Sequence, residues 1–134
     1  MPEKKTTQRA RRDARQGKAP TTQAGEFVHE EMEHVRKGKH GARSTKQVIA
    51  IGLSKARRAG VKVPPKAGKG SSRTRAKAAR DVKKGQSHTA RKTSAKRSRA
   101  TTSALKREGH RAASHQSLSR QAKTAARSRK RTKE

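Results

Sequence analysis

The sequence predicts a mostly disordered chain with all-α elements: a short helical hairpin, at about residues 26–37 and 45–59, flanked by basic arms. Only 26% of the 134 residues are hydrophobic and 1% are aromatic, which is too few to bury a core that offsets chain entropy. The 39 Lys and Arg outnumber the 9 Asp and Glu and give a formal net charge of +30, which opposes compaction unless a polyanion neutralises it. Clear helical periodicity is confined to one segment, and this predicts where the hairpin lies.

The distribution of large apolar residues divides the chain into three segments. Residues 1–24 form a basic N-terminal arm, residues 25–65 a helical hairpin domain, and residues 66–134 a polycationic tail rich in Lys, Arg, Ala and Ser. Ten large apolar residues lie in the middle segment and three in the tail. We therefore expect the hairpin to be marginal alone and to gain stability from a homo-oligomer through Ile51 or from a partner.

The boundaries of the two hairpin helices are marked by capping residues. Ser44 followed by Gln47 fits a capping box, and Gly60 fits the left-handed position that ends a helix. Apolar residues recur at i, i+4 and i+7 in both helices. Glu31 lies inside the apolar stripe of the first helix, and we expect it to meet a cation of the second. The expected hairpin core comprises Phe27, Val28, Met32, Val35, Val48, Ile49, Leu53 and Ala56.

The stretch HEEMEH resembles the zinc-protease signature HExxH, but the second histidine comes one residue late. His29 and His34 are five positions apart and project about 140° from one another on a helix, so they are not placed to chelate one ion together. The sequence has no GxSxG elbow, no phosphate loop ending in GK[ST] and no cysteine. We therefore expect no catalytic residues, no metal, no cofactor and no enzymatic activity.

The tail carries its cations in small clusters separated by Ala, Ser and Thr, a composition that lets the chain become helical once phosphates remove the repulsion. Such clusters suit a phosphate backbone, and the scarcity of aromatic residues argues against base stacking. The candidate nucleic-acid-binding residues lie on the second hairpin helix and along the tail. They are Lys46, Lys55, Arg57, Arg58, Arg73, Arg75, Lys77, Arg80, Lys83, Lys84, Arg91, Lys92, Lys96, Arg97, Arg99, Lys106, Arg107, Arg111, Arg127, Arg129, Lys130, Arg131 and Lys133.

The segment FVHEEMEHVRKGKHG, followed by KQVIAIGLSKARRAGVKVP, resembles a family of small basic bacterial proteins that share a helical-hairpin domain of unknown function. The resemblance covers residues 25–65. It implies a bacterial origin and a hairpin, and transfers no catalytic or ligand-binding residue. Where the family pattern has an acidic residue after the serine, this chain has Lys55. The tail is similar in composition to the tails of linker histones and bacterial histone-like proteins, which implies polyanion binding only.

These observations predict a non-enzymatic, largely sequence-independent DNA-binding protein, histone-like and nucleoid-associated in the cytoplasm, that contacts the phosphate backbone. An RNA-binding or ribosome-associated basic protein is the first alternative, since a small helical core with basic extensions also suits folded RNA. The second is an adaptor that recruits a protein partner through an acidic face formed by Glu26, Glu30 and Glu33. We expect no membrane association, because the longest apolar run, residues 48–53, is too short to span a bilayer.

Overall fold

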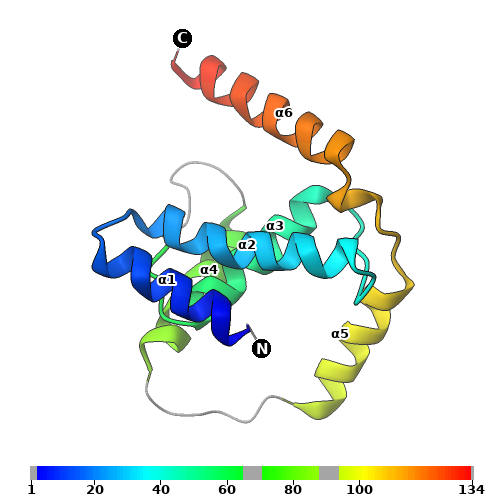
Figure 1. Cartoon of the computed structure of the whole chain (residues 1–134), viewed down its shortest axis with the longest axis horizontal. Coiled ribbons are helices and arrows are strands. Elements are labelled where there is room, and N and C mark those ends of the chain that lie inside the picture. Colours follow the sequence, from blue (N-terminus) through cyan, green and yellow to red (C-terminus); the bar gives the residue numbers. More distant parts are fainter. Residues whose placement is uncertain (1–2, 65–70, 88–93, 134) are drawn as a thin grey trace. The chain divides into compact units, whose positions relative to one another are not determined.

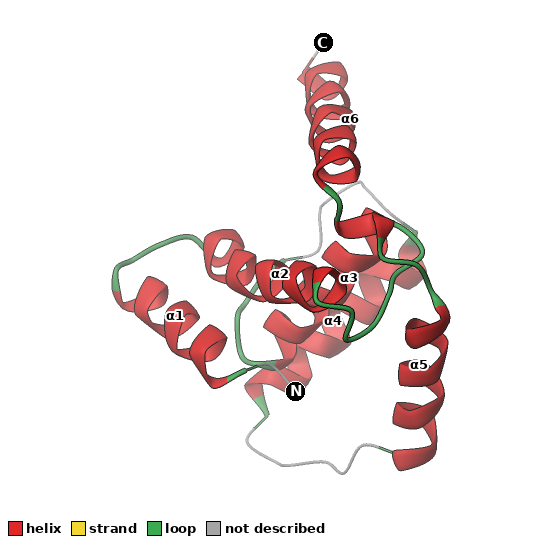
Figure 2. Cartoon of the chain, turned by 45° about the vertical axis from the view of Figure 1, so that its right-hand side comes forward, coloured by secondary structure: helices red, strands yellow, loops and turns green. Residues whose placement is uncertain are grey.

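The computed structural model describes residues 3–64, 71–87 and 94–133. Within these ranges the chain forms six α-helices and one short 3-10 helix, and it contains no strand (Figures 1 and 2). The helices are α1 (Lys4–Arg15), α2 (Pro20–Arg36), α3 (Thr45–Arg58), α4 (Ser72–Gln86), α5 (Ala95–Arg107), η1 (Arg111–Ala113) and α6 (His115–Lys133). The all-α expectation is confirmed, but the expectation of a mostly disordered chain is wrong.

Helix propensity and capping explain why the tail is helical. Alanine is the strongest helix former, and Lys, Arg and Gln follow closely. A serine also caps each of the three tail α-helices by accepting a hydrogen bond from a backbone N–H three residues later. Ser71 Oγ accepts from Thr74 N at 3.2 Å, Ser94 Oγ from Arg97 N at 3.4 Å, and Ser114 Oγ from Ser117 N at 3.2 Å.

The two hairpin helices lie close to their predicted positions. α3 spans Thr45–Arg58, as expected, whereas α2 begins at Pro20, about six residues earlier than expected. Pro20 suits the first turn of a helix, because it lacks only an N–H that would have no partner there. Gly60, with φ at +106°, ends α3, and Val61 N donates to Ala56 O at 3.0 Å. The predicted left-handed termination is therefore confirmed.

The expected capping box forms only in part. Gln47 N donates to Ser44 Oγ at 3.3 Å, as the motif requires. The side chain of Gln47 reaches one residue further back, however, and its Oε1 accepts from Arg43 N at 2.6 Å. Both side-chain acceptors at the start of α3 are therefore hydrogen-bonded, but Gln47 Oε1 accepts from Arg43 N instead of from Ser44 N.

The chain divides into two compact units whose boundaries fall inside α2 and α3. Unit 1 comprises Met1–Glu31 and Ala50–Lys92. Its core contains Phe27, which is fully buried, together with Ala24, Ala56, Val61 and Val63, and Leu53 packs partly buried against it. α1 adds the buried Ala10, because the chain turns back between α1 and α2 (Figure 1). The N-terminal arm thus contributes to the core instead of projecting from it.

Small residues allow close packing in unit 1. A Cβ on Gly52 of α3 would lie 2.6 Å from the Cα of Val28 in α2, and a Cβ on Gly85 of α4 would overlap the carbonyl of Arg57. Ala78 of α4 is buried as well. Contacts of this kind bury area without large side chains, so counting only large apolar residues underestimates the core.

Unit 2 comprises Met32–Ile49 and Thr93–Glu134. Val35 and Val48 are fully buried here, and Met32 and Ala42 are almost completely buried. The tail contributes the buried residues Ala112 and Ala113. Hydrogen bonds attach the tail to the turn between α2 and α3 and to the helix ends on either side of it. Thr45 Oγ1 donates to Ala112 O at 2.6 Å, Arg36 Nε to Ala113 O at 2.9 Å, and Gly41 N to Leu105 O at 2.8 Å. Residues 105–113 are therefore an integral part of this unit.

Two glycine-to-alanine substitutions test the close packing. Gly52→Ala should lower the free energy of unfolding by about 1–3 kcal/mol, because the new methyl group meets the backbone of Val28. Gly25→Ala, within α2, should raise it by about 0.5–1 kcal/mol, since nothing lies within 4 Å of the added Cβ. Urea unfolding followed by circular dichroism measures both changes. Equal effects of the same sign would contradict this packing.

Candidate nucleic-acid interface

Half of the described acidic residues are buried, although the net charge of the chain is +30. Of the eight acidic residues in the described part of the chain, four are buried: Asp13, Glu30, Glu31 and Asp81. A buried carboxylate is costly unless it is paired or hydrogen-bonded. Their partners therefore show how the charge is arranged.

Asp81 of α4 is held by two groups of α3. The hydroxyl of Ser54 donates to Oδ2 at 2.8 Å, and Arg58 Nε donates to Oδ1 at 3.0 Å. The side chain of Asp81 is only 5% exposed, whereas that of Arg58 is 53% exposed. The carboxylate therefore ties α4 to α3 inside unit 1, and Arg58 neutralises it.

Two further carboxylates are neutralised in the same way. Lys55 Nζ of α3 contacts Glu31 Oε1 of α2, and the side chain of Glu31 is fully buried. The expectation that Glu31 meets a cation of the second hairpin helix is confirmed. Asp13 near the end of α1 pairs with Lys18 Nζ at 3.0 Å and also accepts at its backbone carbonyl from Lys18 N. This double contact fixes the turn that follows α1.

The three glutamates expected to form an acidic face on the first hairpin helix differ in their surroundings. Glu30 is 5% exposed, and its Oε1 accepts from Glu3 N at 2.6 Å. Glu26 is half-buried. Glu33 is half-buried too and lies 3.6 Å from Arg36 Nη1. The structure therefore does not present three exposed carboxylates there.

α4 carries a stripe of cations on the side away from its packing face. Ala78 and Asp81 are buried and Val82 and Gly85 half-buried, which defines that face. Four exposed cations recur at i, i+4, i+7 and i+11 and lie within an arc of about 60°, centred about 120° round the helix from the packing face. This α4 basic stripe consists of Arg73, Lys77, Arg80 and Lys84.

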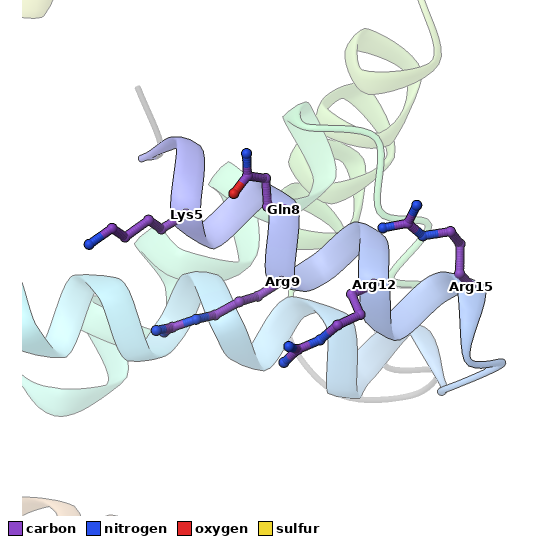
Figure 3. A pocket seen from close by; sticks show the side chains of 5 residues that line it. All are labelled: Lys5, Gln8, Arg9, Arg12 and Arg15. Carbon is purple, nitrogen blue, oxygen red and sulfur yellow. The ribbon is translucent and has the colours of Figure 1, made fainter.

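α1 carries a second stripe, which the sequence analysis did not identify as a site. Thr6, Ala10 and Asp13 are buried at i, i+4 and i+7, and exposed cations recur with the same spacing one position earlier. This α1 basic stripe consists of Lys5, Arg9 and Arg12. With Gln8 and Arg15, these residues line a shallow surface hollow, and Figure 3 shows their side chains extending from the helix. The sequence signal that could have revealed this stripe is the equal spacing of the small residues and the basic residues, one position apart.

In unit 2, α6 shows the same arrangement. In α6, Leu118, Gln121, Ala125 and Ser128 are half-buried. Exposed cations lie on another face, within an arc of about 80°, and this α6 basic stripe consists of Arg120, Lys123, Arg127 and Lys130. Arg120 and Lys123 were absent from the sequence-based prediction. No described residue of α5 is buried. Its cations Lys96, Arg97, Arg99, Lys106 and Arg107 are all exposed.

Most of the predicted binding residues are exposed, but three on α3 make internal contacts. Lys55 meets Glu31, Arg58 meets Asp81, and Arg57 Nε donates to Val63 O at 2.9 Å. Arg91 and Lys92 lie outside the described residues. Arg58 is nevertheless exposed, and so are all the other described residues of the prediction except Lys55 and Arg57: Lys46, Arg73, Arg75, Lys77, Arg80, Lys83, Lys84, Lys96, Arg97, Arg99, Lys106, Arg107, Arg111, Arg127, Arg129, Lys130, Arg131 and Lys133.

Five predicted core residues are buried, whereas three are only half-buried. The buried ones are Phe27, Met32, Val35, Val48 and Ala56, and the half-buried ones are Val28, Ile49 and Leu53.

The HEEMEH stretch, which resembles the zinc-protease signature, lies in α2. His29 is exposed, and the ring of His34 packs edge-on against that of His40, with centroids 6.0 Å apart.

Within the described part of the chain, no helix combines the length and hydropathy that a membrane crossing requires.

Comparison with known proteins identifies a domain but assigns it no activity. Residues 15–67 match the profile of a family of unknown function, DUF6496. This confirms the resemblance of the hairpin segment to a domain of unknown function, and the match begins about ten residues before the expected boundary. No curated protein and no solved structure matches the chain. The function therefore has to be argued from the arrangement of charge.

The buried carboxylate of α4 gives a stability prediction. Asp81→Ala should lower the free energy of unfolding by about 1–3 kcal/mol, because the Ser54 hydroxyl and the Arg58 guanidinium lose their acceptor in a partly buried setting. Glu33→Ala removes the same charge but breaks only a half-exposed i,i+3 pair, so it should change stability by less than about 0.5 kcal/mol. Thermal and urea unfolding of both variants measure the difference, and equal losses would show that net charge alone matters.

Proposed function

We propose that the protein is a non-enzymatic nucleic-acid-binding protein that binds the phosphate backbone of duplex DNA, largely independently of the base sequence. The observation that carries the proposal is the separation of charge. Four of the eight described acidic residues are buried, while α1, α4, α5 and α6 expose cations. A polyanion is the partner whose charge matches such a surface.

The dimensions of the α4 basic stripe suit a phosphate backbone. From Arg73 to Lys84 the helix rises about 16 Å at 1.5 Å per residue. One DNA strand presents a phosphate about every 3.4 Å along the duplex axis, so the stripe spans about five phosphates. Its side chains are Lys and Arg only, and it contains no Asn or Gln positioned to read adenine. Affinity should therefore come from counterion release more than from base contacts.

Two observations favour duplex DNA over other nucleic acids. The single Phe is fully buried, and the chain contains no Trp or Tyr, so it offers no aromatic platform of the kind on which single-stranded bases stack. Its basic surfaces are α-helices, which the major groove of B-form DNA, about 12 Å wide, admits. The deep, narrow major groove of A-form RNA does not admit them.

The identity of the nucleic acid is tested by competition at several salt concentrations. Labelled duplex DNA bound to the full chain should be displaced equally by unlabelled duplexes of different sequence, and less well by structured RNA with the same number of phosphates. For ten phosphate contacts, the slope of log affinity against log salt concentration should be about −9. Stronger displacement by RNA would instead support the RNA-binding alternative, and no binding at moderate salt would overturn the proposal.

A pair of double variants tests whether the stripe itself makes the contacts. R80A/K84A removes two cations from the α4 basic stripe and should make the salt slope shallower by about 1.8, since each phosphate contact contributes about 0.9. R75A/K83A removes the same charges from other faces of α4 and should change the slope by less than half as much. Fluorescence anisotropy over a salt series measures both, and equal changes would show that total charge governs binding.

A further inference from the structure

The positive charge is divided evenly between the two compact units. Unit 1 contains 21 Lys and Arg against six acidic residues, and unit 2 contains 18 against three, so each has a formal net charge of +15. Duplex DNA carries one negative charge per about 1.7 Å of axis. A charge of +15 therefore neutralises about 25 Å of duplex, so either unit alone matches a substantial binding site.

Each unit also has its own basic surface and its own buried residues. Unit 1 carries the α1 and α4 basic stripes on helices anchored by Ala10, Ala78 and Asp81. Unit 2 carries the α6 basic stripe, on a helix whose 19 residues extend about 28 Å. This length is close to that of the duplex that the unit's charge neutralises. α6 contains no acidic residue, so nothing on it opposes phosphate binding.

We propose that the two units bind two separate DNA duplexes, so that one molecule bridges them. This inference rests on the proposed function, since it requires each unit to hold DNA by its phosphates. A molecule with a single binding surface coats a duplex, whereas a molecule with two brings distant segments together.

A capture assay with the full chain tests the bridge. Beads carrying one duplex are incubated with the protein and then with a second, labelled duplex, and both bound protein and recovered label are measured. The protein should recover the label in amounts proportional to the protein on the beads. Absence of protein on the beads would refute the proposed function, whereas bound protein that recovers no label would refute bridging alone.

Two variants with matched charge loss separate the units. R73A/K77A/R80A/K84A removes the α4 basic stripe, and R120A/K123A/R127A/K130A removes the α6 basic stripe, each at a cost of two Arg and two Lys. Each variant should still bind the beads through the intact unit. The amount of recovered label should fall by about fivefold or more, because a bridge requires both sites. Undiminished recovery with both variants would overturn the inference. Circular dichroism should show unchanged helicity, since every replaced residue is exposed.

Mixing the two variants distinguishes a single-molecule bridge from an assembly of several copies. If one molecule must carry both stripes, the mixture at the same total concentration should recover no more label than either variant alone. Recovery restored by mixing would show that associated copies form the bridge, and it would overturn the assignment of both sites to one molecule.

Discussion

The placement of carboxylates inside the protein is the constraint on which the remaining structure depends. A chain with a net charge of +30 can pack its helices only where the cations nearest the core are neutralised. Glu31 does this for Lys55 between α2 and α3, and Asp81 does it for Arg58 between α3 and α4. Since half of the eight described acidic residues are buried, little negative charge remains to offset the cations on the outer faces. The interaction that permits folding also makes the surface a polycation.

Small residues supply the second requirement of this fold. With only 26% hydrophobic residues, the chain gains contact area by letting backbones approach at Gly52 and Gly85 and by burying alanines such as Ala10 and Ala78. Close packing recovers dispersion contacts that large side chains provide elsewhere. The count of large apolar residues left out Ala and Gly, and this is the physical reason why the sequence predicted disorder for segments that form α1, α4 and α6.

The hairpin was predictable because its signals are local. Gly60 marks the end of α3, Ser44 marks its start, and the apolar period identifies Phe27 and Val35 as buried. The position of Glu31 inside an apolar stripe correctly predicted an ion pair with α3. Asp81 in α4 has the same property, because it lies in register with Ala78, Val82 and Gly85. That similarity becomes informative only when alanine and glycine are accepted as core residues.

One helical period generates both the packing face and the basic face. In α1 the buried Thr6, Ala10 and Asp13 and the exposed Lys5, Arg9 and Arg12 recur with identical spacing, one position apart. The cations that stabilise the fold, Lys55 and Arg58, lie on α3 and contact carboxylates, whereas the stripes on α1, α4 and α6 contain none of these paired residues. The side chains that stabilise the fold are therefore different from those to which we assign the proposed polyanion binding. Under the proposed function, changes in the number of exposed cations would alter the strength of binding and its salt dependence without removing an interaction that holds the helices together.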